Sequence, residues 1–160
     1  MPKITSYLGI GSNLGDRTVN IKNSIRYLES NSRIAVKKIS RLYETLPQGG
    51  PKKQPKYLNA AAKIETSLPP SEFLKQLKLI EKRLKRRNSV HWGPRTIDLD
   101  ILFYDDLVFI NKELTIPHPL LDKRAFVLEP LSEIAASYIH PLINKSIKEL
   151  LLKRKKNSKR

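Results

Sequence analysis

The sequence predicts an α+β domain whose elements follow the ferredoxin-like order β-α-β-β-α-β. Residues 4–10 and 57–66 alternate between two faces, as strands do when one face is buried. Two other segments place apolar residues at the spacing of one helical face. With further strands at 33–44 and 96–103, this order predicts an antiparallel sheet that carries both helices on one face.

The first strand and the first helix are separated by a short turn. ITSYLGI (4–10) is predicted as the strand, and Gly11 to Gly15 as the turn. Asp16 is a suitable N-cap for the helix, which ends at Ser30-Asn31-Ser32. The apolar stripe of this helix consists of Ile21, Ile25 and Leu28.

Two strands and a long loop come next. RIAVKKISRLYE (33–44) is predicted as one strand, in which Lys37-Lys38 breaks the alternation and indicates a bulge. The loop at 45–56 holds three prolines and two glycines, which exclude regular structure. YLNAAAKIET (57–66) then alternates. One face holds Leu58, Ala60, Ala62 and Ile64, and the other holds Tyr57, Asn59, Ala61 and Lys63.

Pro69-Pro70 suits the first turn of a second helix, which is expected to run to about residue 87. Its apolar stripe consists of Phe73, Leu77, Ile80 and Leu84. A polar loop leads to the strand TIDLDILF (96–103). Residues 105–152 are expected to form an irregular extension with short helices, the last around Ile147, Leu150 and Leu151.

The chain has 160 residues, so we expect a single domain over 1–152 and a basic C-terminal tail over 153–160. The absence of cysteine excludes disulfides and thiolate metal sites. There is no run of 18 apolar residues, and the N-terminus lacks the apolar stretch of a signal peptide. We therefore expect a cytoplasmic protein with no membrane span.

The chain is strongly basic, with a formal net charge of +16. Within 75–95, eight Lys or Arg residues stand against one acid, Glu81. Such a charge attracts polyanions, so nucleotides, nucleic acids and acidic membrane surfaces are candidate ligands.

Two aspartates interrupt the apolar run of the strand at 96–103. Asp98 and Asp100 share one strand face, because residues i and i+2 project to the same side. Neighbouring carboxylates repel each other unless a cation lies between them, and oxygen ligands without nearby His or Cys favour Mg²⁺. A metal beside a basic patch indicates bound phosphates. The alternative is a solvated pair neutralised by Arg95 and nearby lysines.

Other side chains are candidates for ligand contact. Tyr57 and Asn59 face away from the predicted core, where an Asn beside an aromatic ring can bind the edge of a flat heterocycle. An ordinary exposed pair is the alternative. His118, between two prolines, has Arg124 and Phe126 close behind it in the chain. A purely structural role is the alternative for His118. It is also the alternative for Trp92, the single tryptophan, which lies in a Pro/Gly loop.

The turn GIGSNLG (9–15) is similar to a dinucleotide-binding fingerprint. Its spacing is GxGxxxG, and the next strand is followed at once by another strand rather than by a second βα unit. A tight strand-to-helix turn is therefore the better interpretation. The predicted order of the elements excludes an NADP-dependent oxidoreductase.

Four blocks of sequence resemble the 6-hydroxymethyl-7,8-dihydropterin pyrophosphokinase family and occur in the family's order. They are YLGIGSNLGDR (7–17), YETLPQGGPKKQPKYLNAA (43–61), HWGPRTIDLDIL (91–102) and LTIPHPLLDKRAFVLEPL (114–131). The resemblance implies a ferredoxin-like αβα sandwich with a short C-terminal extension. It also implies transfer of pyrophosphate from ATP to the hydroxymethyl group of the pterin, releasing AMP, as a step of folate biosynthesis.

The resemblance also implies the site. Two Mg²⁺ ions would be bound by Asp98 and Asp100, with ATP as co-substrate. The pterin would be held by Thr45, Tyr57 and Asn59, between the rings of Trp92 and Phe126. ATP would meet His118, Arg124, Arg95 and loop arginines, here Arg86 or Arg87. The catalytic set would be Arg86, Arg87, Arg95, Asp98 and Asp100. We expect a monomer.

The sequence departs from the family pattern at a few positions. The loop reads Leu84-Lys85-Arg86-Arg87-Asn88 where Gly-Arg usually precedes the second arginine, so the register of the two arginines is open. His91 stands where Arg is common, Leu46 replaces a frequent Pro, and Glu113 stands where some members carry an Arg shortly before the TxPHP segment. That Arg helps to close the active site in those members, so closure of the site or the rate would differ here.

A nucleic-acid-binding module is the competing hypothesis, because basic ferredoxin-like domains occur among RNA-binding proteins. Against it, the sheet shows no pair of stacking aromatic residues, and the acidic pair would repel phosphates without a metal. We therefore expect no nucleic-acid binding beyond weak binding by the basic tail.

Overall fold

The computed structural model describes residues 2–47, 53–84 and 96–158. Its elements are β1 (Ile4–Ser12), α1 (Arg17–Glu29), β2 (Ile34–Ile39), β3 (Tyr43–Thr45), β4 (Tyr57–Thr66), α2 (Pro70–Arg83), β5 (Asp98–Tyr104), β6 (Phe109–Ile110), β7 (Thr115–Ile116), the 3₁₀ helix η1 (Leu121–Lys123), α3 (Ala125–Ala135) and α4 (Ile147–Ser158). No helix in these ranges is long and apolar enough to cross a membrane.

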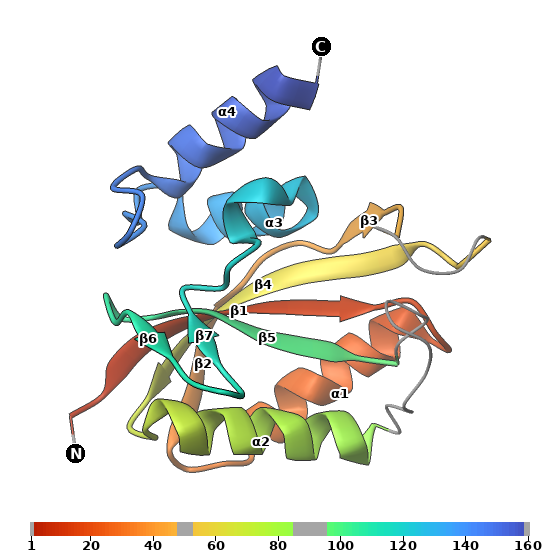
Figure 1. Ribbon diagram of the computed structural model, residues 1–160. Coiled ribbons are helices and arrows are strands. Elements are labelled where there is room, and N and C mark those ends of the chain that lie inside the picture. Colours follow the sequence, from red (N-terminus) through yellow and green to blue (C-terminus); the bar gives the residue numbers. More distant parts are fainter. Residues whose placement is uncertain (1, 48–52, 85–95, 159–160) are drawn as a thin grey trace.

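The main sheet is antiparallel, with strand order β2-β4-β1-β5, and β3 also pairs with β4. Helices α1 and α2 lie on one face, and α3 and α4 lie on the other (Figure 1). The predicted ferredoxin-like order and αβα sandwich are therefore confirmed. The sheet face opposite α1 and α2 is partly covered by α3, which packs against β4.

Two apolar clusters lie on the two faces of the sheet. The first joins alternate residues of β4, including Leu58 and Ile64, to Phe73 and Leu77 of α2. The second joins Ala61 and residues of β5 to α3 and α4. The predicted alternation of β4 is thus confirmed, and Asp16 caps α1 by accepting a hydrogen bond from the N–H of Val19 (3.1 Å).

The predicted strand 33–44 is two strands, β2 and β3, which both pair with β4 and are separated by an interruption of the regular ladder. The register shifts between Val36 and Lys38, where the bulge was predicted. After β2 ends, Ser40 donates its N–H to the carbonyl of Ala61 and accepts the Ala61 N–H on its hydroxyl, both at 2.9 Å. A serine side chain thus replaces a backbone carbonyl in the ladder.

A second irregularity lies in β5. Leu8 of β1 pairs with Ile101, but the preceding Tyr7 pairs with Phe103, so Leu102 is an extra residue. Leu102 and Phe103 consequently both join the cluster beneath α3 and α4. Such a bulge changes the direction of the following side chains and bends the strand.

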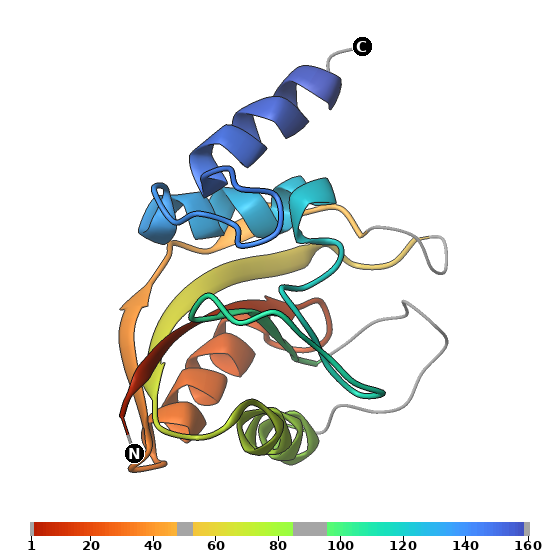
Figure 2. The same cartoon turned by 60° about the vertical axis from the view of Figure 1, so that its left-hand side comes forward.

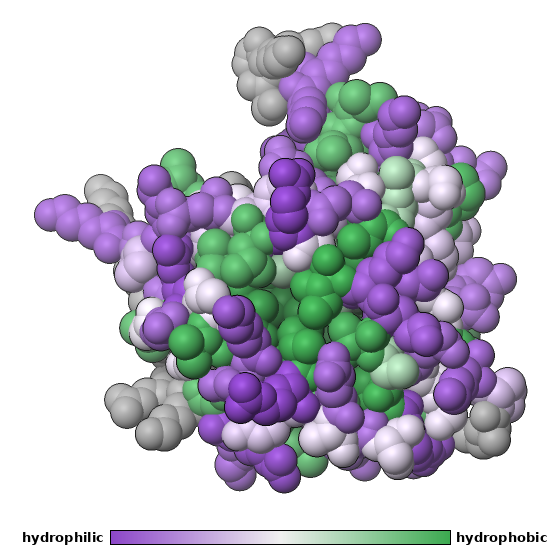
Figure 3. Space-filling model, turned by 180° about the vertical axis from the view of Figure 1, so that it is seen from behind, coloured by the Kyte–Doolittle hydropathy of each residue, from purple (hydrophilic) through white to green (hydrophobic). Residues whose placement is uncertain are grey.

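The C-terminal part is more regular than predicted. A β6–β7 hairpin, η1 and the two helices α3 and α4 follow β5. Helix α4 continues to Ser158, so residues 153–158 of the predicted tail are helical, and its end projects from the body (Figure 2). Helix α2 ends at Arg83, four residues before its predicted end. On the side opposite to Figure 1, apolar side chains gather in the middle and hydrophilic ones surround them (Figure 3).

Candidate active site

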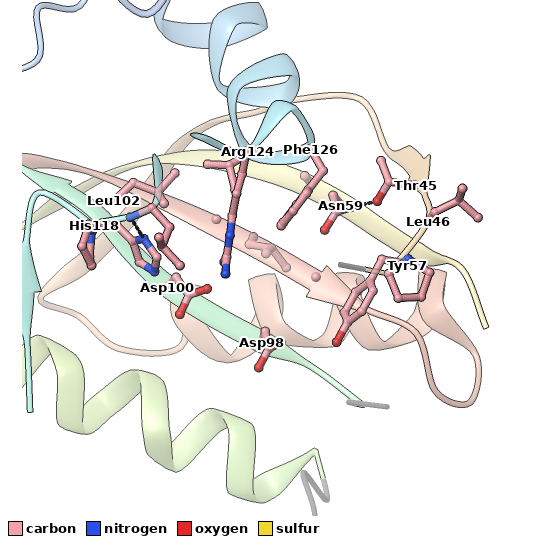
Figure 4. A pocket seen from close by; sticks show the side chains of 18 residues that line it. Thr45, Leu46, Tyr57, Asn59, Asp98, Asp100, Leu102, His118, Arg124 and Phe126 are labelled. Atoms are coloured by element: carbon pink, nitrogen blue, oxygen red, sulfur yellow. Dashed lines mark hydrogen bonds between the residues drawn. The ribbon is translucent and has the colours of Figure 1, made fainter. Parts of the chain in front are cut away.

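A pocket of about 400 Å³ opens on the α3 side of the sheet, between β1, β4 and β5 and the segments that lead into and out of the strands (Figure 4). This volume suits a small ligand. Its lining consists of Gly9, Ile10, Gly11, Thr45, Leu46, Pro47, Tyr57, Asn59, Ala60, Asp98, Asp100, Leu102, His118, Pro119, Leu120, Arg124, Phe126 and Val127. The predicted site residues that the structure describes all line this pocket: Thr45, Tyr57, Asn59, Asp98, Asp100, His118, Arg124 and Phe126.

The aspartate pair projects from β5 on the pocket side. Leu99 and Ile101, which alternate with the aspartates, lie in the core against α2. Asp98 is partly exposed and Asp100 is exposed, so neither carboxylate carries the full desolvation cost of burial. The β1 partners of the two aspartates are Gly11 and Gly9 respectively, so no neighbouring side chain of β1 fills the space beside the carboxylates.

The amide of Asn59 is fixed at the other end of the pocket. Asn59 is 6% exposed, which excludes the alternative of an ordinary exposed residue. Its Nδ2 donates to the hydroxyl of Thr45, two residues along β3 from Tyr43, the residue opposite Asn59. A buried amide with a fixed orientation presents defined hydrogen-bonding groups to a ligand.

His118 is held as a neutral imidazole. Its backbone N–H donates to the carbonyl of Leu102 (3.0 Å), and its Nδ1 accepts the N–H of Leu120 (3.2 Å). Burial, and to a smaller extent the charge of Arg124, lower the pKa of His118 to about 4. Because Nδ1 is the acceptor, the ring proton is assigned to Nε2.

Arg124 and Phe126 enter the pocket from the start of α3. The Arg124 guanidinium lies over the Phe126 ring, 5.5 Å from its centroid, in cation–π contact. Figure 4 shows Arg124 reaching from α3 toward β5, with Phe126 between it and Asn59. The basic and aromatic groups thus stand opposite the carboxylates and the amide.

Four predicted residues, Arg86, Arg87, Trp92 and Arg95, lie outside the described residues, and so does His91. The structure adds lining residues that the predicted site lacked. Gly9 and Gly11 belong to the GIGSNLG segment and lie in β1, which continues to Ser12 instead of ending at residue 10 as predicted. The glycine spacing of this segment was a signal of a nearby ligand. Leu120 and Val127 carried no such signal, because ordinary apolar residues do not reveal a pocket in a sequence.

Comparisons with known proteins agree with these observations. The profile of 7,8-dihydro-6-hydroxymethylpterin-pyrophosphokinase (HPPK) matches residues 7–136. The chain is 45% identical over 145 residues to the 2-amino-4-hydroxy-6-hydroxymethyldihydropteridine pyrophosphokinase of Aquifex aeolicus, covering 91% of this chain and 89% of that protein. The corresponding enzyme of Bacillus subtilis is 42% identical over 129 residues, with 81% and 77% covered.

Solved structures share the fold. A crystal structure of HPPK-DHPS in complex with substrates has a TM-score of 0.76 at 16% identity, covering 98% of this chain and 44% of that chain. Wild-type Plasmodium falciparum HPPK-DHPS with pteroate has a TM-score of 0.73 at 18% identity, covering 94% and 42%. The chain spans less than half of those structures, and likeness at this identity supports the fold alone. The family resemblance is nevertheless confirmed by the profile and the closely related enzymes: the chain belongs to the 7,8-dihydro-6-hydroxymethylpterin-pyrophosphokinase family, the pterin pyrophosphokinases of folate biosynthesis, whose substrates are a pterin and ATP.

Proposed function

We propose that this pterin pyrophosphokinase carries out its reaction in the pocket between β5 and α3, with two Mg²⁺ ions held by Asp98 and Asp100. The products would be AMP and the diphosphate of 6-hydroxymethyl-7,8-dihydropterin. The observation that supports this most is that one pocket contains both the carboxylate pair and the fixed amide of Asn59. The first suits the metal-bound phosphates and the second suits a flat heterocycle.

The residues present fit magnesium. Among the described residues, no group of three or more His, Cys, Asp or Glu side chains could enclose a metal. Two adjacent, solvent-accessible carboxylates are instead what Mg²⁺ uses when water and substrate phosphates complete its coordination. Magnesium bound there would supply neutralisation of the triphosphate charge.

The pterin would lie between the α3 side of the pocket and the β3–β4 edge. Asn59 and Thr45 would hydrogen-bond the heterocycle, and Phe126 would stack on its face. Tyr57 lines the same end of the pocket. Trp92, which lies outside the described residues, would cover the other face of the ring.

ATP would lie between the carboxylates and the basic side. His118 would donate a hydrogen bond from Nε2 while remaining neutral, and Arg124 would contribute the positive charge. Arg95, with Arg86 or Arg87, would add to the basic side. These groups hold and neutralise phosphate oxygens, which is most of what phosphoryl-type transfer requires of a protein.

In the proposed step, the hydroxymethyl oxygen forms a bond to the β-phosphorus of ATP. The bond from the β-phosphorus to the oxygen that bridges the α- and β-phosphates breaks, and this oxygen leaves with AMP. The hydroxyl proton is released to solvent. Because both substrates would lie in one pocket of one chain, we further propose that the enzyme acts as a monomer. We also propose that it acts in the cytoplasm.

Product analysis tests the proposal. The protein is mixed with ATP, Mg²⁺ and 6-hydroxymethyl-7,8-dihydropterin, and the nucleotides are resolved by chromatography. AMP that forms only when the pterin and Mg²⁺ are both present supports pyrophosphoryl transfer. ADP would indicate ordinary phosphoryl transfer and a wrong assignment. No nucleotide product from a folded sample would favour a diverged binding protein.

A further inference from the structure

A cluster of three side chains outside the pocket joins α3 to the start of β3. Glu133 of α3 accepts hydrogen bonds from the Tyr43 hydroxyl (2.6 Å) and from Nε of Arg41 (3.0 Å), and its second oxygen accepts the backbone N–H of Arg41 (2.9 Å). Arg41 also donates to the Tyr43 hydroxyl (3.3 Å). Arg41, Tyr43 and Glu133 are referred to below as the Glu133 cluster.

The position of the cluster explains why the carboxylate is needed there. Ser40 occupies the place in the ladder opposite Ala61, and β3 begins only at Tyr43. The backbone N–H of Arg41 donates to Glu133 instead of to β4. The carboxylate therefore defines the path by which the chain enters β3.

Stability alone is a weak reason for this arrangement. The Arg41 side chain is 80% exposed and that of Glu133 is 27% exposed. An ion pair in such a place adds little to the free energy of unfolding. The Tyr43 hydroxyl and the Arg41 contacts lower the pKa of Glu133, so the carboxylate is ionised and accepts all three hydrogen bonds at neutral pH.

On β3, the cluster is connected directly to the polar end of the pocket. Tyr43 is paired with Asn59 across β3 and β4. Thr45 is two residues after Tyr43 and so projects to the same side of the strand. A shift of Tyr43 would therefore move both groups that form the Asn59–Thr45 hydrogen bond.

On α3, the cluster is connected to the aromatic wall. Glu133 follows Phe126 by seven residues, close to two helical turns, so the two side chains share a side of the helix. Pro130 lies between them and has no N–H to donate to the Phe126 carbonyl. The helix therefore lacks one hydrogen bond between the turn of Phe126 and the turn of Glu133. Leu128 and Leu131 pack α3 on the sheet, and Glu133 adds the polar contact to β3. Figure 1 shows β3 beside α3.

We propose that Glu133 is a positioning residue for the pterin: by tying α3 to β3, it sets the gap between the Phe126 ring and the edge formed by Thr45 and Asn59. This inference rests on the proposed function of the pocket. A rigid flat ring must stack on one wall and hydrogen-bond the other at the same time, so its binding depends steeply on this gap. ATP, at the carboxylate end, would meet α3 only through Arg124 and would contact neither Thr45 nor Asn59, so its binding should depend less on this gap.

The test compares Glu133→Ala and Tyr43→Phe with the wild type and with Glu129→Ala. The last variant removes the same charge one turn earlier on α3 and leaves the Tyr43 and Arg41 contacts in place. Calorimetry measures the affinity for 6-hydroxymethyl-7,8-dihydropterin in the presence of Mg²⁺ and α,β-methylene-ATP, and separately the affinity for α,β-methylene-ATP. Steady-state AMP formation gives kcat and KM for each substrate, and thermal unfolding confirms that each variant is folded.

We expect Glu133→Ala to weaken pterin binding about tenfold, Tyr43→Phe to weaken it about threefold, and both to raise the pterin KM in parallel. Affinity for the ATP analogue and kcat should stay within about twofold of the wild type, as should every value for Glu129→Ala. Unchanged pterin affinity in folded Glu133→Ala and Tyr43→Phe would overturn the positioning role, and so would an equal loss of pterin and ATP affinity. Wild-type protein that binds no pterin would instead overturn the proposed function.

Discussion

A Cβ atom on Gly11 would lie 3.0 Å from Oδ1 of Asn59. The two residues are paired across β1 and β4, and Gly11 lines the same pocket as the Asn59 side chain. On its other side, the amide is held by the Thr45 hydroxyl. Glycine at position 11 therefore leaves the space that lets the buried amide keep its orientation.

Substitution Gly11→Ala should displace the Asn59 amide and weaken pterin binding by roughly tenfold or more, because overpacking typically costs about 1–3 kcal/mol. Calorimetry with the dihydropterin measures the effect. Gly9→Ala is the matched control on the same strand, because its Cβ would meet Leu102 at 3.5 Å, an ordinary contact. Equal pterin affinity in the Gly11 variant and the wild type would contradict the steric argument.

Removal of either pocket carboxylate should abolish turnover without unfolding the protein. Asp98→Asn and Asp100→Asn remove charge with little change in shape, so we expect kcat for AMP formation to fall by more than about a hundredfold. The melting temperature should hold or rise, because repulsion between neighbouring carboxylates is relieved. Asp106→Asn, in the turn after β5, is the charge-matched control. Near-wild-type activity in either pocket variant would contradict the assignment of these carboxylates as metal ligands.

The free energy of unfolding should fall as the pH decreases from about 6.5 to about 4. The pKa of His118 is lowered from 6.5 to about 4, so in this window the unfolded chain binds a proton that the folded chain does not. The lost stability amounts to about 3 kcal/mol. Urea unfolding across this pH range measures it.

The free energy of unfolding should depend less steeply on pH in His118→Gln. Part of the dependence should persist, because burial also lowers the pKa of His140. Equal slopes in the wild type and the His118 variant would show that His118 is not held neutral by the fold. Comparison of slopes, rather than of stability at one pH, separates titration from any loss of packing.

The basic end of α4 should be dispensable for catalysis. A chain that ends at Lys153 loses Arg154, Lys155, Lys156, Lys159 and Arg160, which lowers the formal net charge from +16 to +11. Ile147 and Leu150, which bury α4 against the body, are retained. We expect kcat and KM to stay within about twofold and the stability within about 0.5 kcal/mol.

The same shortened chain tests the nucleic-acid hypothesis. RNA binding by the full chain, followed by fluorescence anisotropy, should be weak, steeply dependent on salt, and largely lost on shortening. Tight RNA binding that survives both shortening and EDTA would instead identify a nucleic-acid site on the folded domain. The structure gives such a site little support on the sheet, because α3 covers part of the face that RNA would use and the carboxylate pair occupies another part.

Much of the site could be predicted because its residues belong to distinctive local patterns. Asp98 and Asp100 stand in an apolar strand, and the strict alternation of β4 places Asn59 on the pocket side. The burial of Asn59 and the tie from Arg41 to Glu133 could not be predicted, since each needs α3 or β3, elements far away in the chain. The break after Ser40 was missed for the same reason, because it depends on a hydrogen bond from Ala61.

The sequence by itself determined the order of the elements, the core faces of β4 and β5, the position of the bulge in β2, and the family. These follow from periodicity and short motifs, which are properties of neighbours in the chain. Only the tertiary structure decided that α3 would cover part of the sheet and form a pocket with Asn59, and that His118 would be neutral beside Arg124. The physical reason is that burial, pKa and ladder pairing depend on groups brought together from distant parts of the chain, and no local pattern records which groups will meet.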